Sequence, residues 1–468
     1  MFIHLTTKLT RRASTVRRSN IATMNSLSID QINSFREEFS KDKAAKIAQN
    51  AVMSCTITDV ALNRDIVAQT THSFSNQIDE WSVTNQKSSG RCWLFAMLNL
   101  FRVGAAKKLK VKDFEFSQAH IHFFDKLERA NHMLEAIIET ADRDVDDRTV
   151  KWILGDPICD GGQWPMAINI IRRHGLVPKD VFPESQSSSA TLQMNARLKD
   201  LLRSSACELR NILEQGGSVE AARKHKEACM KDVWRVLCIH LGTPPTKFDW
   251  SWTDKDKKHQ AVSMTPVEFM NEYVTLDYED YVCVVHDPRN PYMQTYTVDY
   301  LQSVAGGPKL IYLNVEVEMM KEITRRQLLD GLPVWMGCDV GKQLHRPTGI
   351  WHLDIFEYEN LYGCQFGMNK RDRLLYSQTL MTHAMMFTGV DVDPESGKAK
   401  KWRVENSWGD ANGKKGFYCM HDNWFNEHMF EIATPRSYLS EEMVKALDTT
   451  PIMLPAWDPM GSLAQDTV

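Results

Sequence analysis

The sequence lacks the marks of several protein classes. No window approaches 18 consecutive apolar residues, so it predicts no membrane span. Its ten cysteines form no CxxC pair and follow no regular spacing, which argues against both a disulfide framework and a zinc module. There is also no Asn-x-Ser/Thr glycosylation acceptor. These absences favour a reducing compartment, and we expect neither a metal nor a cofactor.

Acidic residues are missing from one end of the chain. The first of them is Asp30, whereas residues 1–29 contain five basic residues and many serines and threonines. This composition is typical of a mitochondrial transit peptide, and the alternative is a disordered basic tail. Met24 could act as an internal start that yields a form without the basic segment. We therefore expect cytoplasmic and mitochondrial forms of the protein.

The rest of the chain carries a net negative charge. Without residues 1–29, which hold five basic and no acidic residues, the formal charge changes from −4 to −9. A net acidic body gives no general support for nucleic-acid binding, although a local basic surface would still allow it. With 43% hydrophobic and 25% charged residues, the composition is that of a globular protein with two or three packed subdomains.

The hydrophobic pattern changes from helical to strand-like along the chain. Helical spacing predicts an amphipathic helix over 28–49, a buried helix from Cys92, a helix from Ser117 and a helical block over 188–241. The final third holds short segments rich in β-branched and aromatic residues, which predict an antiparallel sheet or partial barrel. The sequence thus predicts an α+β protein. Its expected parts are a leader (1–29), a helical part with the nucleophile (30–187), a helical insertion (188–262), a β-rich part (263–450) and a C-terminal arm (451–468).

The stretch NQKSSGRCWLFA places Cys92 after a polar loop and at the start of an apolar helix. At a helix start, unpaired N–H groups and the macrodipole favour an anion, so this position favours the reactive thiolate. Gly90 would let the backbone bring the sulfur to a surface. The competing interpretation is a buried apolar cysteine, which is the usual role of a free cysteine.

Four other residues favour the nucleophile interpretation. His383 opens a predicted strand, where its ring would be rigid yet reachable for proton transfer. Asn406 ends a neighbouring predicted strand, where its amide oxygen could orient the imidazole, and Trp408 would shield that contact from water. Gln86 could donate a side-chain N–H to a developing oxyanion, together with the Cys92 backbone N–H. Taken singly, each of these has an ordinary structural explanation.

The order of these residues resembles that of the papain-like cysteine peptidases. The matching segments are Gln86, Cys92-Trp93, His383-Ala384 and Asn406-Ser407-Trp408-Gly409. The tetrapeptide DGGQ is similar to the family's glycine pair, which implies that Gly161 and Gly162 bind the backbone of an extended substrate. Cys92 and His383 are 291 positions apart, against roughly 130 to 150 in typical members, which fits an insertion. Ser89 stands where the secreted members have a disulfide-forming cysteine.

A closer resemblance is to the bleomycin hydrolase branch of this family, a group of intracellular thiol aminopeptidases. The segments that carry it are NQKSSGRCWLFA, FFDKLERAN, DGGQ, HDPRNPY, LMTHAM, RVENSWG and WDPMGSLA. The resemblance covers about residues 28–465. It implies a papain-like core with large helical insertions and a homohexamer whose active sites face a central cavity. It also implies a C-terminal arm that restricts cleavage to peptide N-termini.

The implied arm makes the last residues candidates for the site. A terminal carboxylate close to the nucleophile would block longer chains and pair with a substrate α-ammonium, and Ala464 and Gln465 are placed to do so. The chain continues through residues 466–468, beyond the usual end of the family. Either these residues are trimmed or the arm is set differently. We predict trimming near Ala464 or Gln465 by the enzyme's own site.

The resulting hypothesis is a cysteine aminopeptidase that cleaves peptide N-termini through a thiolate–imidazolium pair and an acyl-enzyme. By resemblance, bleomycin and homocysteine thiolactone are further substrates. One alternative is an endopeptidase with a displaced arm, and another is a hexamer that binds single-stranded nucleic acid as a second activity. A catalytically dead scaffold is disfavoured because all four site residues are present.

Overall fold

The computed structural model describes residues 24–78 and 81–464, which fall into two compact units. The smaller unit contains the described residues up to Ala61 together with Tyr358–Cys364, and the larger unit contains the others. Residues 1–23 of the predicted leader, Gln465 and residues 466–468 lie outside the described residues. The boundaries expected at residues 187, 262 and 450 stay predictions.

The smaller unit is helical. It consists of α1 (Ile29–Lys41), α2 (Lys43–Val52), α3 (Ile57–Val60) and α14 (Tyr358–Tyr362). The single helix predicted over 28–49 is wrong at Asp42, which has extended backbone dihedral angles and accepts a hydrogen bond from the Ala45 N–H at 2.9 Å. Asp42 therefore ends one helix and caps the next, as aspartate at an N-cap commonly does.

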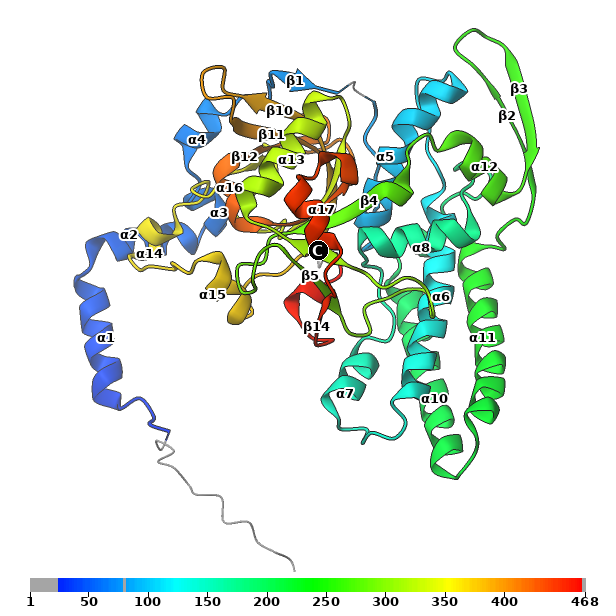
Figure 1. The fold of residues 1–468 in the computed structure, drawn as a ribbon. Helices are drawn as coiled ribbons and strands as arrows, with labels where there is room; N and C mark the ends of the chain where they lie inside the picture. The colour runs from blue at the N-terminus through cyan, green and yellow to red at the C-terminus, as the bar shows by residue number, and fades with distance from the viewer. Residues whose placement is uncertain (1–23, 79–80, 465–468) are drawn as a thin grey trace, which may run out of the picture. The chain divides into compact units, whose positions relative to one another are not determined.

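The larger unit begins with a helical part. Its helices are α4 (Arg64–Gln69), α5 (Cys92–Leu109), α6 (Gln118–Glu139), α7 (Arg148–Gly155), α8 (Trp164–His174), α9 (Gln186–Ser189), α10 (Leu192–Glu214), α11 (Val219–Leu241) and α12 (Pro266–Tyr273). Apolar residues cover nearly every face of α5, which is buried along most of its length, as the sequence predicted. Ser117 caps α6 by accepting from the His120 N–H. In Figure 1, α6, α10 and α11 lie side by side, and each pair is in contact.

The end of the predicted helical insertion contains a β-hairpin that the sequence did not predict. Strands β2 (Phe248–Thr253) and β3 (His259–Met264) pair antiparallel. The rings of Trp250 and Trp252 stack with centroids 4.5 Å apart, and the Trp252 indole N–H donates to the Leu109 carbonyl at 3.1 Å. These tryptophans thus attach the hairpin to the end of α5.

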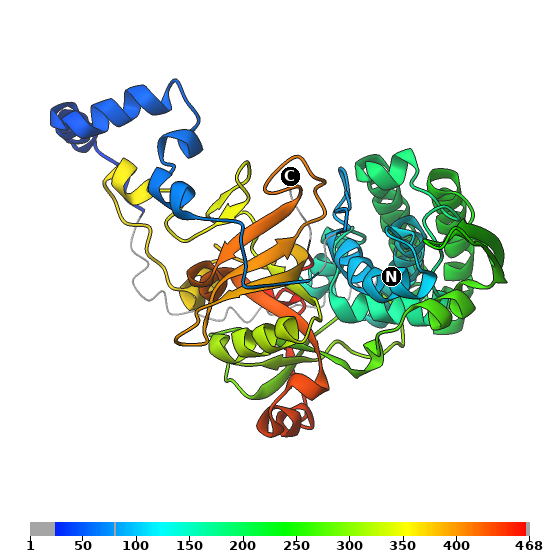
Figure 2. The same cartoon turned by 90° about the horizontal axis from the view of Figure 1, so that it is seen from above.

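A 12-stranded sheet forms the other side of the described larger unit (Figure 2). Its strands are β1 (Asn76–Gln77), β4 (Tyr281–Val285), β5 (Gln294–Val298), β6 (Tyr312–Asn314), β7 (Val334–Cys338), β8 (Leu344–His345), β9 (Ile350–Trp351), β10 (His383–Val392), β11 (Ala399–Glu405), β12 (Phe417–His421), β13 (Met429–Pro435) and β14 (Ile452–Leu454). Most pairs are antiparallel, but β4–β6, β5–β14 and β9–β12 are parallel, so the purely antiparallel expectation is wrong there.

Short helices follow or connect these strands. They are α13 (Val317–Leu329), α15 (Lys370–Leu375), α16 (Asp422–His428), α17 (Glu441–Leu447) and the 3-10 turns η1 (Tyr278–Asp280), η2 (Arg436–Tyr438) and η3 (Pro459–Gly461). Strand β10 pairs with β7 on one side and β11 on the other, and it also contacts α5. The start of the nucleophile helix therefore meets the start of β10. Among the described helices, none is long and apolar enough to cross a membrane.

Glu431 of β13 is a carboxyl group inside the sheet core. It accepts a hydrogen bond from the Cys283 thiol, and burial raises the pKa of Glu431 from 4.5 to about 7. Between these pH values the folded chain binds a proton that the unfolded chain releases. The contribution of Glu431 to stability is therefore greatest below pH 4.5 and is lost as the pH rises through about 7.

We expect Glu431→Gln to remove this pH dependence, because glutamine keeps the acceptor oxygen and does not ionise. The free energy of unfolding of the variant should exceed that of the wild type by up to about 3 kcal/mol at pH 8 and differ little at pH 4.5. Chemical denaturation at both pH values measures this difference. Glu442→Gln, on the exposed side of α17, is the matched control. A Glu431 variant that is less stable than wild type at both pH values would contradict the expectation.

Candidate active site

Cys92 is the first residue of α5, so the structure confirms the predicted helix start. Its side chain is fully buried, with contacts to two backbone groups from distant parts of the chain. The thiol donates to the Ala464 carbonyl with a sulfur–oxygen distance of 3.5 Å, and the Ala384 N–H points at the sulfur from 3.4 Å. The first contact comes from the C-terminal arm and the second from β10. Cys92 therefore lies where the helical part, the sheet and the arm meet.

His383 and Asn406 come together because β10 and β11 are neighbours. His383 is the first residue of β10, and Asn406 directly follows the last residue of β11. The His383 Nε2 and Asn406 Oδ1 atoms are 2.9 Å apart, and the Ser407 N–H also donates to this oxygen at 2.7 Å. The Trp408 ring lies 4.8 Å from the imidazole, measured between centroids. Ala384, the residue after His383, contacts the Cys92 sulfur. Cys92, His383 and Asn406 therefore lie in one place, and Trp408 lies beside His383.

Gln86 joins the loop before Cys92 to the turn after Asn406. Its side-chain N–H donates to the Ser89 carbonyl at 2.6 Å, and its side-chain oxygen accepts from the Ser407 hydroxyl at 2.6 Å. The Gln86 backbone N–H donates to the Ser407 carbonyl at 2.8 Å. The amide is buried and fixed in orientation, with one of its two hydrogens directed to Ser89.

An ion pair next to Cys92, between a buried arginine and a partly exposed glutamate, was not predicted. The Arg91 guanidinium is completely buried and binds both carboxylate oxygens of Glu184 at 2.9 Å, while its Nε–H donates to the Ser89 hydroxyl at 2.9 Å. Bidentate pairs of this kind fix geometry as well as charge. The sequence showed Arg91 directly before Cys92, but it gave no sign that Glu184 was its partner.

Asp160 is a second anchor that sequence reasoning missed, although it begins the DGGQ motif. Its carboxylate accepts from the Gly90 N–H at 3.1 Å and binds the Lys126 ammonium at 2.7 Å, and its carbonyl accepts from the Trp93 indole N–H at 2.7 Å. Burial by itself would raise the pKa of Asp160, but Lys126 and the other donors hold the pKa well below its ordinary value. The ionised carboxylate thus ties the glycine pair to the nucleophile loop.

The two glycines differ in their contacts. Gly162 forms an antiparallel bridge with Ala464, and its carbonyl accepts from the Ala464 N–H at 3.4 Å. A Cβ atom at Gly162 would lie 2.6 Å from the Trp93 indole, so no other residue fits there without rearrangement. The Gly161 carbonyl instead accepts from the Arg129 guanidinium at 2.9 Å. Of the predicted substrate-binding pair, Gly162 is the residue whose backbone pairs with the arm.

The arm is held along several residues before Ala464. The side-chain N–H₂ of Gln163 donates to the Met460 and Ser462 carbonyls at 3.3 and 2.8 Å. Tyr312 donates its hydroxyl hydrogen to the Gln163 side-chain oxygen, which orients this amide. The Ser462 hydroxyl donates to the Met381 carbonyl at 2.8 Å. Ala464 is consequently fully buried, while Gln465, the other predicted arm residue, lies outside the described residues.

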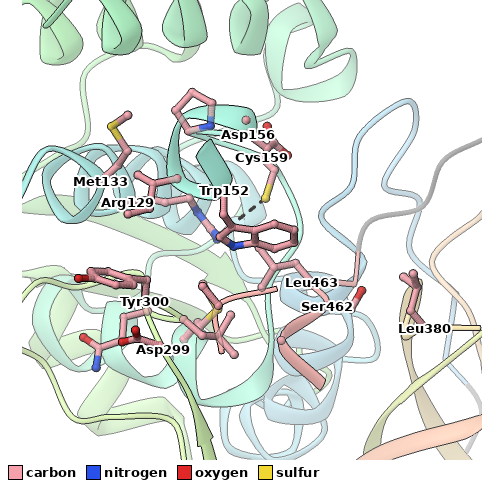
Figure 3. Close-up of a pocket in the computed structure, with 18 of the residues that line it drawn as sticks. Arg129, Met133, Trp152, Asp156, Cys159, Asp299, Tyr300, Leu380, Ser462 and Leu463 are labelled. Carbon is pink, nitrogen blue, oxygen red and sulfur yellow. Dashed lines mark hydrogen bonds between the residues drawn. The ribbon is translucent and has the colours of Figure 1, made fainter. Parts of the chain in front are cut away.

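A cavity of about 750 Å³ lies beside the arm (Figure 3). Trp152, Tyr300 and Leu380 provide apolar walls, and Ser462 and Leu463 of the arm form part of the lining. Thr382, directly before His383, also lines it. The arm therefore occupies only part of the space next to the site, and the cleft continues alongside it.

Comparisons with known proteins show the family of the chain. The profile of the Peptidase C1-like family matches residues 26–461. Human bleomycin hydrolase is 40% identical, with 94% of this chain and 99% of that protein covered. Aminopeptidase C of Lactococcus lactis is also 40% identical, with 92% and 97% covered. The crystal structure of PepW from Lactobacillus rhamnosis superposes with a TM-score of 0.91 at 38% identity and covers 94% of this chain and 99% of its own. The chain therefore belongs to the Peptidase C1-like family, in the group that contains the bleomycin hydrolases and aminopeptidases C.

Proposed function

We propose that this cysteine peptidase is an aminopeptidase that removes N-terminal residues from peptides, with Cys92 as the nucleophile. The observation that carries the proposal is the position of Ala464. Its carbonyl touches the Cys92 sulfur and its backbone pairs with Gly162, so the arm fills one side of the cleft as an extended peptide would. A substrate can then extend from Cys92 in one direction only.

The chemistry follows from the contacts of His383. With Nε2–H donating to Asn406, Nδ1 is the ring nitrogen that accepts the Cys92 proton. The thiolate attacks the first peptide carbonyl, and the oxyanion is bound by the Cys92 backbone N–H and the second N–H of the Gln86 side chain. The imidazolium then protonates the leaving amine as the C–N bond breaks. Water, deprotonated by His383, hydrolyses the acyl-enzyme and releases the amino acid.

Trimming of the chain end belongs to the same proposal. The Ala464 carbonyl lies next to the Cys92 sulfur, where the carbonyl of a scissile bond would lie. Attack there breaks the bond between Ala464 and Gln465, releases residues 465–468 with a new α-amine and leaves Ala464 as a thioester on Cys92. Water then hydrolyses the thioester, which restores the thiol and gives Ala464 a terminal carboxylate. That carboxylate would bind the α-ammonium of a peptide, because opposite charges attract strongly where water is excluded.

The proposal is tested with a pair of peptides that differ only at the N-terminus. We expect rapid release of the first residue when the α-amine is free, and a loss of about 100-fold or more in kcat/KM when it is acetylated. The loss follows from removal of a desolvated charge pair, which typically costs 2 to 5 kcal/mol. Mass spectrometry of the products identifies the cleaved bond. Equal rates for both peptides would favour an endopeptidase.

Finer properties are proposed on the sequence resemblance. Bleomycin and homocysteine thiolactone both carry bonds that a thiolate can attack, and the name of the human relative supports the first of them. A homohexamer and single-stranded nucleic-acid binding as a second activity are proposed on the same resemblance. Cytoplasmic and mitochondrial forms are proposed on the basic composition of residues 1–29 and on Met24 as an internal start. A shift of single-stranded DNA mobility that depends on salt and survives Cys92→Ala would support the second activity.

A further inference from the structure

The helical hairpin of α10 and α11 brings together three side chains that the peptidase mechanism does not use. Glu208 lies on α10, and His225 and Cys229 lie on α11. Their carboxylate oxygen, Nε2 or Nδ1, and Sγ atoms all lie within 4.8 Å of one another. The Glu208 Oε2 and His225 Nε2 atoms are 2.7 Å apart. We propose that these three residues form a zinc-binding site that joins the two helices.

The arrangement follows from helix geometry. His225 and Cys229 are four residues apart on α11, so they project from the same helix face, one turn from each other. Glu208 faces them because α10 and α11 pack along their lengths as an antiparallel pair. In a tetrahedral zinc site with bonds of 2.0 to 2.3 Å, the ligand atoms are about 3.5 Å apart. The ligand atoms lie within 4.8 Å of one another, so rotations of the three side chains would bring them to this spacing.

The chemistry of the donors selects the metal. One thiolate, one imidazole and one carboxylate suit Zn²⁺, whereas Mg²⁺ and Ca²⁺ require oxygen ligands. Cys229 is buried, while His225 is half-buried and Glu208 is exposed, so an ion would enter from the Glu208 side and keep water as a fourth ligand. The carboxylate and thiolate together balance the charge of the ion.

Neighbouring cations do not prevent binding. Arg223 and Lys226, on the same helix as His225, are both held by Glu135 of α6, with an Arg223–Glu135 distance of 2.9 Å. Glu135 thus balances one of these two positive charges and holds both cations on the side of α11 that faces α6. A bound zinc ion would link α10 to α11. It would also stabilise the hairpin, since a ligand that binds only the folded chain shifts the folding equilibrium towards the folded state.

The test uses the full chain with Cys92→Ala, so that the active-site thiol cannot bind the ion. After removal of metal with a chelator, we expect dialysis against Zn²⁺ to load one ion per chain, measured by elemental analysis. With Co²⁺ as probe, the thiolate ligand should give a near-ultraviolet charge-transfer band. Zn²⁺ should also raise the melting temperature.

Two ligand variants and one control decide the outcome. Cys229→Ala and His225→Ala should each weaken Zn²⁺ binding at least about tenfold, because loss of even an outer-shell partner can cost that much. Cys229→Ala should also abolish the Co²⁺ band. Cys207→Ala, which removes an exposed thiol next to Glu208, should leave binding unchanged. The proposal is overturned if the chain takes up no Zn²⁺, or if uptake is the same in both ligand variants. Because His225 is only half-buried, we expect His225→Ala to fold normally. A loss of Zn²⁺ binding in this variant would then reflect the missing ligand and not a loss of the fold.

Discussion

Replacing Cys92 with alanine should reduce hydrolysis of aminoacyl-arylamides by about 10⁴-fold or more, since without the nucleophile no acyl-enzyme can form. The fold should persist. Cys92 is the first residue of α5, and alanine retains helix propensity while removing only the sulfur atom. Steady-state kinetics measure the activity, and circular dichroism with a thermal melt measures the fold.

A matched control separates the chemistry from the loss of a buried sulfur. Cys419 of β12 is also fully buried, and burial raises the pKa of this thiol to about 12, which keeps it protonated and inert. Cys419→Ala should therefore retain wild-type turnover apart from a modest loss of stability. If Cys92→Ala kept turnover close to that of the wild type, the assignment of the nucleophile would be refuted.

The variant Cys92→Ala also tests whether the enzyme trims its own C-terminus. Because the Ala464 carbonyl lies at the Cys92 sulfur, the active protein should end at Ala464 by intact-mass spectrometry, whereas Cys92→Ala should keep all residues to Val468. Adding active enzyme to the variant tests whether one chain can trim another. Fully active protein that retains Val468 would contradict trimming.

The residues at the reaction centre were predictable because each carries a local signal. Cys92 opens an apolar helix two residues after Gly90, His383 opens a strand, and Asn406 follows a strand. The resemblance to papain-like peptidases then joined positions 291 residues apart. Gln86 was found in the same way, but its contacts with Ser89 and Ser407 were not, because they depend on how two loops pack.

The parts that support the centre could not be read from the sequence. The Arg91–Glu184 pair and the donors around Asp160 join segments that have no pattern in common, and only tertiary packing brings them together. The β2–β3 hairpin was hidden for another reason. Its alternating tryptophans lie within about ten residues of the end of a long helical block, and periodicity over so short a segment is ambiguous.

The cluster of Glu208, His225 and Cys229 illustrates the same limit. The ligands are 17 and 4 positions apart on two helices and match no metal-binding motif. The number and spacing of the cysteines led to the expectation that the chain binds no metal. Spacing motifs detect only sites whose ligands come from one short segment or from repeated pairs of residues. A site whose ligands lie on two helices can be recognised only when it is known which residues of the two helices face each other.

Truncating the chain after Gly461 should convert the enzyme from an exopeptidase towards an endopeptidase. The deletion removes Ser462 and Ala464, and with them the backbone that pairs with Gly162 and covers Cys92. Peptides could then extend through the cleft and along the cavity beside the arm. We expect the ratio of kcat/KM for acetylated over free peptides to rise about 100-fold, since the charge pair with the α-ammonium is lost. Product mapping should show internal cleavage.

A single substitution tests the same point with the chain complete. Gln163→Leu removes the donor that binds the Met460 and Ser462 carbonyls, and the lost hydrogen bonds typically contribute about 0.5 to 1.5 kcal/mol each. Because the arm would leave the cleft more often, the same ratio should rise by about 10-fold. Asn169→Leu is the control, since Asn169 is an amide on α8 that donates to Pro308 and has no hydrogen bond to the arm within the described residues. If truncation raised internal cleavage but Gln163→Leu did not, the arm would be held by its backbone pairing with Gly162. If neither variant cleaved acetylated peptides, the restriction to N-termini would have another source than the arm.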